Sequence, residues 1–157
     1  MPAQFLHGVD VIEIDDGVRP IKTVKSSVIG VVGTAPSADP AIFPLNVPVI
    51  ITGSATKAAL LDTVGTGLGT LPGVMDGIFD QAGATVIVIR VEEGADDAAT
   101  DTNVIGNSVY PRTGVNALRD AESILGYKPR ILIAPGFSDT LAVATELEGV
   151  ANKLKAI

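Results

Sequence analysis

The sequence predicts an α/β fold: a mostly parallel or mixed β-sheet flanked by helices, with an extended N-terminal arm ahead of it. Four short apolar runs have the length and composition of buried strands, and they lie at residues 28–32, 47–51, 86–91 and 130–134. Amphipathic segments with helical periodicity separate most of these runs. Strands separated by helices imply right-handed crossovers and helices on the faces of the sheet.

The predicted strands carry cues to their places in the sheet. Residues 28–32 are apolar on both faces, and residues 84–91 are almost unbroken β-branched residues, which suits strands covered on both sides. Pro48 stands near the start of the second run, so this strand is expected to begin there or to lie at an edge. The fourth run stops at a Pro135-Gly136 turn and is expected to be a central strand.

Two helices are expected between the second and third strands. Ser54 is a good N-cap for a short helix over residues 55–61. Thr70 is a good N-cap for a longer helix that Gly83 ends. The apolar residues of the longer helix recur at i, i+3, i+4, i+7, i+8 and i+11, and they are Leu71, Val74, Met75, Ile78, Phe79 and Ala82.

Two more helices are expected on either side of the fourth strand. Residues 92–107 are acidic, small and glycine-containing, which predicts a surface loop or a weak turn of helix. Thr113 is expected to cap a helix that Gly126 closes. Asp139 is expected to cap the last helix, whose inward face carries Leu147, Val150, Ala151 and Leu154.

The N-terminal segment lies outside this pattern. Residues 5–14 alternate imperfectly between the two faces of an extended chain, and Gly8 with Glu13, Asp15 and Asp16 makes them a poor central strand. We therefore expect residues 1–22 to form an extended arm and residues 23–157 to form one α/β core domain. An edge strand of the chain's own sheet is the alternative interpretation of the arm.

The composition excludes several classes of function. Net charge is −7 with a pI near 4.5, which disfavours binding to the phosphate backbone of nucleic acids and to anionic membranes. Cysteine is absent, and the single histidine, His7, excludes sites that need two imidazoles. No apolar run reaches the length of a membrane span, so no membrane insertion is expected.

Arg90 and Arg112 are each expected to form a structural ion pair, with Glu92 or Asp120 as candidate partners.

Two motifs invite comparison with ligand sites but lack their signatures. The Gly-x-Gly-x-Gly motif at 65–69 resembles a dinucleotide loop, yet Thr70 stands where that fingerprint needs glycine and the motif follows a predicted helix. Asp96, Asp97 and Asp101 lack the alternating ligands and the bidentate glutamate of an EF-hand loop. A solvated acidic loop is the interpretation of this cluster.

Ser138 follows a predicted strand and a Pro-Gly turn, the position of a nucleophile in some α/β enzymes. The Gly-x-Ser-x-Gly pattern is absent, and His7 lies in the predicted arm. The simpler role for Ser138 is to enter a helix capped by Asp139. We therefore expect no catalytic residues, no bound cofactor and no metal site, and hence a protein that is not an enzyme.

Several segments taken together carry a family resemblance. They are Phe-Leu-His-Gly-Val at 5–9, Ser-Ser-Val-Ile-Gly at 26–30 with Gly33, Asn-Val-Pro-Val at 46–49, Ala-Thr-Val-Ile-Val-Ile-Arg-Val at 84–91, Arg-Thr-Gly-Val-Asn-Ala-Leu at 112–118 and Pro-Arg-Ile-Leu-Ile-Ala-Pro-Gly-Phe-Ser at 129–138. Their order and spacing cover nearly the whole chain. In this respect the chain resembles the sheath proteins of contractile phage tails, of the P2/Mu-like and R-type pyocin-like kind.

The resemblance implies a structural subunit that polymerises around a rigid tail tube and contracts to drive the tube through a target envelope. It implies a virion tail or tail-like particle assembled in the host bacterial cytoplasm. The implied partners are further copies of the subunit, the tail tube protein, the baseplate and the tail terminator. The resemblance implies neither nucleotide nor metal.

The resemblance also gives the N-terminal arm a role. In such sheaths, extended arms add strands to neighbouring subunits, and an alternating segment suits that form of recognition. The residues expected at this subunit interface are Phe5, Leu6, His7, Gly8, Val9, Val11, Ile12 and Ile14. Family members continue well beyond the region represented here, so we expect residues 23–157 to be an incomplete core domain.

Two alternative functions remain open at this point. The order of strands and helices also permits a small α/β nucleotide-binding or enzyme domain. A sheath component of a related injection apparatus, such as a type VI secretion system, shares the features of the same core.

Overall fold

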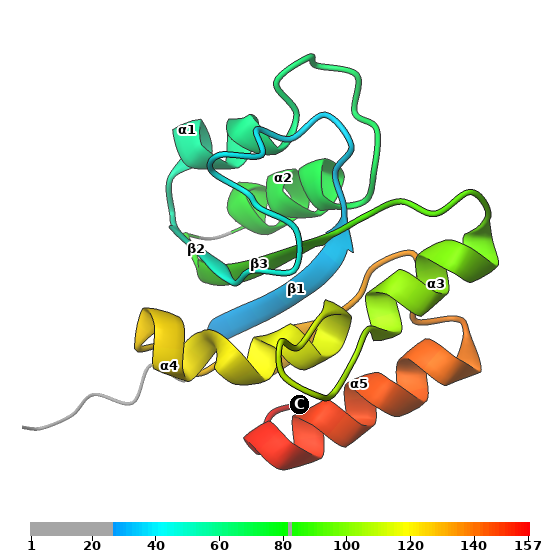
Figure 1. The fold of residues 1–157 in the computed structure, drawn as a ribbon. Coiled ribbons are helices and arrows are strands. Elements are labelled where there is room, and N and C mark those ends of the chain that lie inside the picture. The colour runs from blue at the N-terminus through cyan, green and yellow to red at the C-terminus, as the bar shows by residue number, and fades with distance from the viewer. Residues whose placement is uncertain (1–26, 82) are drawn as a thin grey trace, which may run out of the picture.

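A computed structural model describes residues 27–81 and 83–157 and shows a four-stranded sheet between two layers of helices (Figure 1). The strands are β1 (Val28–Thr34), β2 (Val49–Thr52), β3 (Thr85–Val91) and β4 (Ile131–Ile133). The predicted α/β class is therefore confirmed. The predicted arm, residues 1–22, lies outside the described residues.

The strand order is β2-β3-β1-β4. β1 pairs in parallel with both β3 and β4, whereas β2 is antiparallel to β3, so the sheet is mixed. β2 begins directly after Pro48 and lies at an edge, as predicted. The prediction of a central position for the fourth strand is wrong: β4 is the opposite edge of the described sheet, because β1 occupies the centre between β3 and β4.

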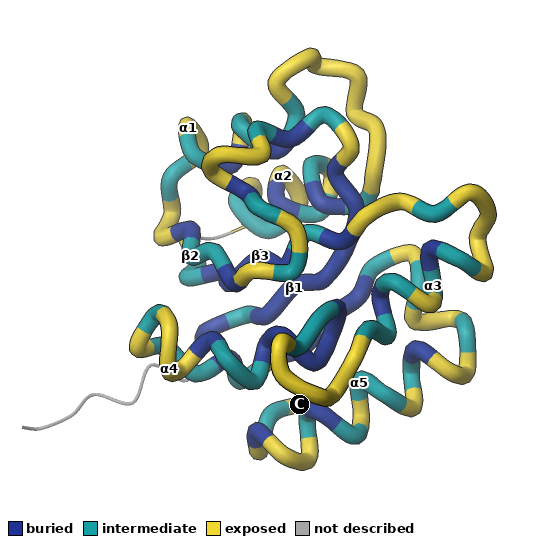
Figure 2. Tube along the Cα trace, viewed as in Figure 1, coloured by how far each residue is buried: buried dark blue, intermediate teal, exposed yellow. Residues whose placement is uncertain are grey.

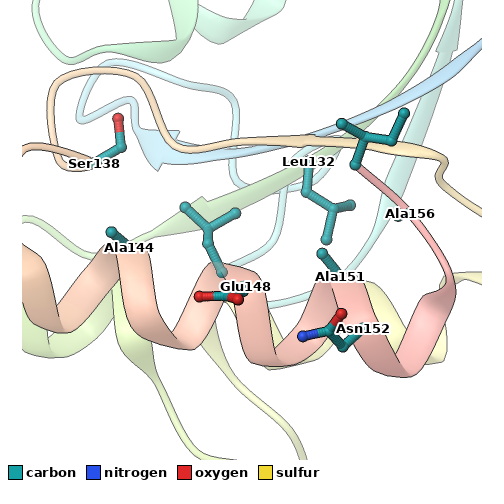
Figure 3. A pocket seen from close by; sticks show the side chains of 9 residues that line it. Leu132, Ser138, Ala144, Glu148, Ala151, Asn152 and Ala156 are labelled. Carbon is teal, nitrogen blue, oxygen red and sulfur yellow. The ribbon is translucent and has the colours of Figure 1, made fainter.

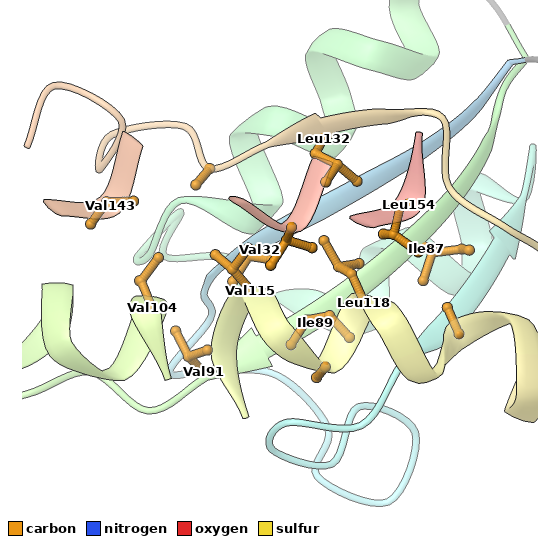
Figure 4. Close-up of a cluster of buried hydrophobic side chains, with 14 of the residues drawn as sticks. Val32, Ile87, Ile89, Val91, Val104, Val115, Leu118, Leu132, Val143 and Leu154 are labelled. Carbon is orange, nitrogen blue, oxygen red and sulfur yellow. The ribbon is translucent and has the colours of Figure 1, made fainter. Parts of the chain in front are cut away.

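The core consists of two apolar clusters, one on each face of the sheet, and the central strands contribute to both. Most of β1 and β3 is coloured as buried in Figure 2. In the first cluster, Val32, Ile87 and Ile89 of the sheet pack against helical residues that include Leu118 and Leu154 (Figure 4). On the other face lie Val31, Val86, Val88, Phe43, Ile51, Leu61, Leu71 and Met75. This double covering is what the unbroken β-branched runs predicted.

The second cluster is covered by three short helical segments. These are α1 (Ala55–Ala58), a 3₁₀ turn η1 (Ala59–Leu61) and α2 (Leu71–Gln81). The Ser54 hydroxyl oxygen accepts a hydrogen bond from the Lys57 amide at 3.2 Å, so the predicted N-cap is confirmed. In α2, Leu71 and Met75 are buried, as its predicted apolar face requires.

The first cluster is covered by the helical segments that follow β3. They are α3 (Asp97–Ile105), a 3₁₀ helix η2 (Gly114–Asp120), α4 (Ala121–Leu125) and α5 (Leu141–Leu154). The expectation of a loop or weak helical turn over 92–107 is wrong, because α3 is a regular helix. The Asp96 carboxylate accepts from the Ala99 amide at 2.7 Å and caps it, while Thr100 and Val104 are buried.

Two predicted helix starts differ from the structure. The segment after Thr113 begins as a seven-residue 3₁₀ helix and becomes α-helical only at Ala121, while Gly126 ends it in the left-handed conformation as predicted. The Thr113 hydroxyl accepts from the Asn107 amide at 2.8 Å and so stabilises the preceding loop. The last helix has Thr140 at its N-cap position, one residue after the predicted Asp139.

The two arginines expected to form ion pairs make contacts of different kinds. Arg112 forms the predicted ion pair with Asp120. Arg90 does not pair with Glu92. Its Nε donates to the carbonyl of Phe43 at 2.7 Å, and its Nη1 donates to the carbonyl of Ala35 at 3.3 Å. This side chain therefore holds the loop between β1 and β2 against the end of β3.

The backbone after α3 passes very close to the backbone before η2. Gly106 has φ +67°, and a Cβ there would lie 2.1 Å from the carbonyl oxygen of Thr113. Gly126 has a similar φ of +71°, but a Cβ there would meet nothing within 4 Å. The crossing at Gly106 thus depends on glycine both for its dihedral angles and for space.

We predict that Gly106→Ala lowers the free energy of unfolding by about 3 kcal/mol, because the methyl group forces two backbone segments apart and the backbone is strained. Gly126→Ala is the matched control: it costs only about 1 kcal/mol, for the left-handed conformation alone. Urea denaturation of both variants measures the difference. Equal losses would contradict the importance of the close approach.

We predict that Arg90→Met lowers the free energy of unfolding by about 2 kcal/mol, because it leaves the buried carbonyl of Phe43 without its charged donor. Lys153→Met on the exposed side of α5 is the control and is expected to change stability by less than about 0.5 kcal/mol. Thermal or chemical unfolding followed by circular dichroism compares the two. A loss at Arg90 no larger than at Lys153 would show that the loop does not depend on this contact.

Candidate functional site

The predicted interface residues cannot be placed in the fold. Phe5, Leu6, His7, Gly8, Val9, Val11, Ile12 and Ile14 all lie outside the residues that the structure describes. Their role as a subunit interface stays a prediction. The chemistry-bearing residues of the core domain and the edges of its sheet can be compared directly.

The acidic cluster at 96–101 does not converge on one point. Asp96 caps α3 through its bond to the Ala99 amide. Asp101 accepts a hydrogen bond from the Thr140 hydroxyl at 2.8 Å and so ties α3 to the start of α5. Among residues 27–81 and 83–157 there is no group of three potential ligands that could hold a metal ion.

The glycine-rich loop surrounds a carboxylate of the chain itself. The Asp62 carboxylate accepts from the Gly67 amide at 2.6 Å and from the Gly65 amide at 3.0 Å. The hydrogen bond from Gly67, followed by smaller contributions from neighbouring amides, holds the pKa of Asp62 below its usual value. Amides that would cradle a phosphate in a nucleotide loop are thus engaged by Asp62.

The position at which open α/β sheets usually bind ligands is filled from within. The connections after β1 and β4 leave toward opposite faces of the sheet, which makes the carboxyl ends of these neighbouring strands a topological switch point. Thr70 lies there: its hydroxyl accepts from the Thr34 amide at 3.2 Å, and its amide donates to the Thr34 carbonyl at 2.9 Å. A Cβ at Gly136 would come within 3.2 Å of the Thr70 methyl group.

Ser138 lies in the turn between β4 and α5. Its amide donates to the carbonyl of Ala134 at 3.1 Å, as does the amide of Phe137, so this segment closes the strand in a tight turn. The simpler role predicted for this serine, entry into the last helix, agrees with the geometry. The position of Ser138 also places it on the rim of a hollow described below.

The two edge strands of the described sheet, β2 and β4, have different groups bonded to them. At β2, the Lys57 ammonium donates to the carbonyl of Ile50 at 2.7 Å, so a charged side chain lies against this short edge strand. At β4, the main chain of the last residue pairs with the strand. The Leu132 amide donates to the main-chain oxygen of Ile157 at 2.7 Å, and the Ile157 amide donates to the carbonyl of Arg130 at 2.8 Å.

A hollow of about 390 Å³ lies beside this second edge, between β4 and α5 (Figure 3). Three polar residues line it: Ser138, Glu148 and Asn152. The other lining residues are small or apolar: Leu132, Ala144, Leu147, Ala151, Ala156 and Ile157. No set of catalytic groups converges on it. We regard the β4 edge and this hollow together as the candidate interaction surface of the core domain.

Sequence reasoning did not place this surface at the fourth strand, because it expected that strand in the centre of the sheet. The only local signal is the short apolar Ala156-Ile157 that follows the last helix. Hydrophobicity alone cannot assign two residues to a strand.

None of the helices in the described part of the chain is long and apolar enough to cross a membrane.

No family model matches the sequence. The chain is 41% identical to the tail sheath protein of Escherichia phage P2 over 164 residues, which cover 98% of this chain and 40% of the phage protein. It is 38% identical to the major tail sheath protein of Serratia phage KSP20, over 99% of this chain and 40% of that protein. It is 29% identical to the tail sheath protein of Burkholderia phage BcepMu, over 100% of this chain and 48% of the relative.

These matches agree with the resemblance noted in the sequence. The chain spans about two fifths of the length of the first two curated relatives and about half of the third. The similarity extends from one end of this chain to the other and is not confined to a single motif. Over nearly its whole length, this chain is a homologue of the phage tail sheath proteins.

Proposed function

We propose that this chain is part of a structural subunit of a contractile tail sheath, which polymerises around a tail tube and contracts to drive the tube through a target envelope. The observation that carries the proposal is the 41% identity to a phage tail sheath protein over 98% of the chain. Because that match covers two fifths of the relative, the assembly and contraction belong to the longer protein.

The core domain suits a scaffold. Three polar groups from the candidate loops and strand ends have structural partners: Asp96 caps a helix, Asp62 binds the amides of its own loop, and Thr70 fills the switch point. We therefore expect the protein to be non-enzymatic and to require no cofactor. A rigid α/β body of this kind transmits force between rings without chemistry of its own.

We propose that residues 5–14 act as the arm that links subunits, by adding a strand to a sheet edge of a neighbouring copy. About six main-chain hydrogen bonds, each worth roughly 1 kcal/mol net, would contribute on the order of 6 kcal/mol per arm. One such contact is weak, but a mesh of repeated contacts holds while the subunit bodies rotate. This arrangement would keep the sheath intact during contraction.

The partners follow from this role. They are other copies of the subunit, the tail tube protein, the baseplate and the tail terminator, and the assembled protein would lie in the virion tail or a tail-like particle. The net charge of −7 disfavours a nucleic-acid partner. Assembly in the bacterial cytoplasm is part of the same proposal.

We predict that antibodies raised against this chain label the sheath of the parent particle along its whole length in electron micrographs. Antibodies against a tube protein are the control and should label only the tube exposed after contraction. Uniform labelling is expected because every ring contains the subunit. Labelling confined to the head, the fibres or one end of the tail would overturn the proposed function.

We predict that deletion of residues 1–16 from the full-length protein abolishes stable sheaths, because the linking strand is lost. Deletion of residues 1–3, which keeps residues 5–14, is the matched control and should leave assembly intact. Negative-stain microscopy counts the sheaths, and circular dichroism verifies that both variants fold. Stable sheaths from the longer deletion would refute the role of the arm.

A further inference from the structure

The hydrogen bonds of Ile157 are those of a parallel β-ladder. In such a ladder, one residue donates to the residue before its partner and accepts from the residue after it. Ile157 donates to the carbonyl of Arg130 at 2.8 Å and accepts from the amide of Leu132 at 2.7 Å, so its partner in register is Ile131. Ile157 therefore lies on the outer side of β4, in the register of a parallel partner.

The end of α5 directs the chain into this register. Lys155 adopts the left-handed conformation at φ +53°, and the Ala156 amide donates to the carbonyl of Ala151 at 2.9 Å, which together reverse the chain after the helix. The guanidinium of Arg130 donates to the carbonyl of Lys155 at 3.0 Å. The helix end is thus tied to the strand beside which it emerges.

The direction of this connection repeats the one before it. From β3 the chain crosses the face of the first cluster through α3, η2 and α4 and enters the sheet at β4, on the far side of β1. From β4 it crosses the same face through α5 and arrives one strand further out at Ile157. Both crossovers consequently have the same hand, as repeated strand–helix–strand units do.

We propose that the outer edge of β4 accepts a fifth, parallel strand, and that its occupant is the polypeptide that follows Ile157 in the longer protein. By the alternation of a parallel ladder, the next groups of β4 that point outward are the Leu132 carbonyl and the Ala134 amide. A residue two positions after Ile157 would bond to both. The ladder would then extend along β4 toward the turn at Ser138.

The hollow beside β4 agrees with this occupant. Successive residues of a strand point to opposite faces, so the residue after Ile157 would lie next to Leu132 and face α5. Leu132, Ala144, Leu147 and Ala151 line the hollow on that side. The first and third residues after Ile157 should therefore be apolar, and their side chains would fill the space between β4 and α5.

The opposite face of the same edge also lacks cover. Ile131 is 39% exposed and Ile157 is 92% exposed, although both are aliphatic and lie at the edge of the sheet. In the longer relatives, more than half of the polypeptide lies outside the matched part, which supplies enough chain for a strand and its covering elements. The proposal needs only a chain that continues past Ile157, so it stands or falls independently of the sheath function.

Amide hydrogen exchange tests the proposal on two proteins: the 157-residue chain and the same chain extended by about eight residues encoded after Ile157, the length of an ordinary strand. We expect exchange of the Ala134 amide to slow by about tenfold or more in the extended chain, because that amide gains an acceptor. The Val88 amide in the central strand β3 is the internal reference and should exchange alike in both proteins.

Ala144→Trp in the extended chain fills the hollow and should return the Ala134 amide to fast exchange. Ala98→Trp on the exposed side of α3 is the matched control and should leave the Ala134 amide protected. Equal exchange of Ala134 in the two chain lengths, or a gene that ends at Ile157, would overturn the proposal. Protection that rises with the concentration of the 157-residue chain would also overturn it, because a second copy would then be the occupant.

Discussion

The structure depends on two neighbouring strands that must be apolar on both faces. β1 and β3 pair over seven residues, from Val28 opposite Thr85 to Thr34 opposite Val91. Each face of this pair opens into a separate cluster of buried side chains, so helices are required on both sides. With few aromatic residues in the chain, valine, isoleucine, leucine and alanine provide most of this packing.

A centre filled in this way leaves little room for chemistry. The polar groups near the strand ends are used to hold loops: Arg90 binds the carbonyls of Phe43 and Ala35, and Thr70 bonds to Thr34 at the switch point. What remains available is the border of the sheet. The β2 border has the ammonium of Lys57 against it, whereas the β4 border continues into Ile157. A border of this kind is where the subunit proposed above would contact other polypeptide.

Local sequence predicted the elements whose signals are local. The β-branched run of β3, the N-cap at Ser54 and the glycine at position 126 each act within a few residues, and each was predicted correctly. α3 was missed because only Thr100 and Val104 are buried, which gives a weak apolar face, and because its N-cap Asp96 was interpreted as part of an acidic loop. The 3₁₀ helix η2 starts at the crossing of Gly106 and Gly114, two residues that lie eight positions apart in the sequence and whose close approach is set by the folded chain.

The sequence by itself determined the α/β class, the double covering of the central strands, the start of β2 beside Pro48 and the resemblance to tail sheath proteins. These conclusions rest on the amino-acid composition, the spacing of apolar residues and the order of the segments along the chain. The tertiary structure alone decided that β4 lies at an edge and that Ile157 pairs with it, because strand order depends on which backbone groups are already bonded. Apolar runs of similar composition leave that order open. The strand predicted to lie at the centre of the sheet therefore forms one border of the described sheet.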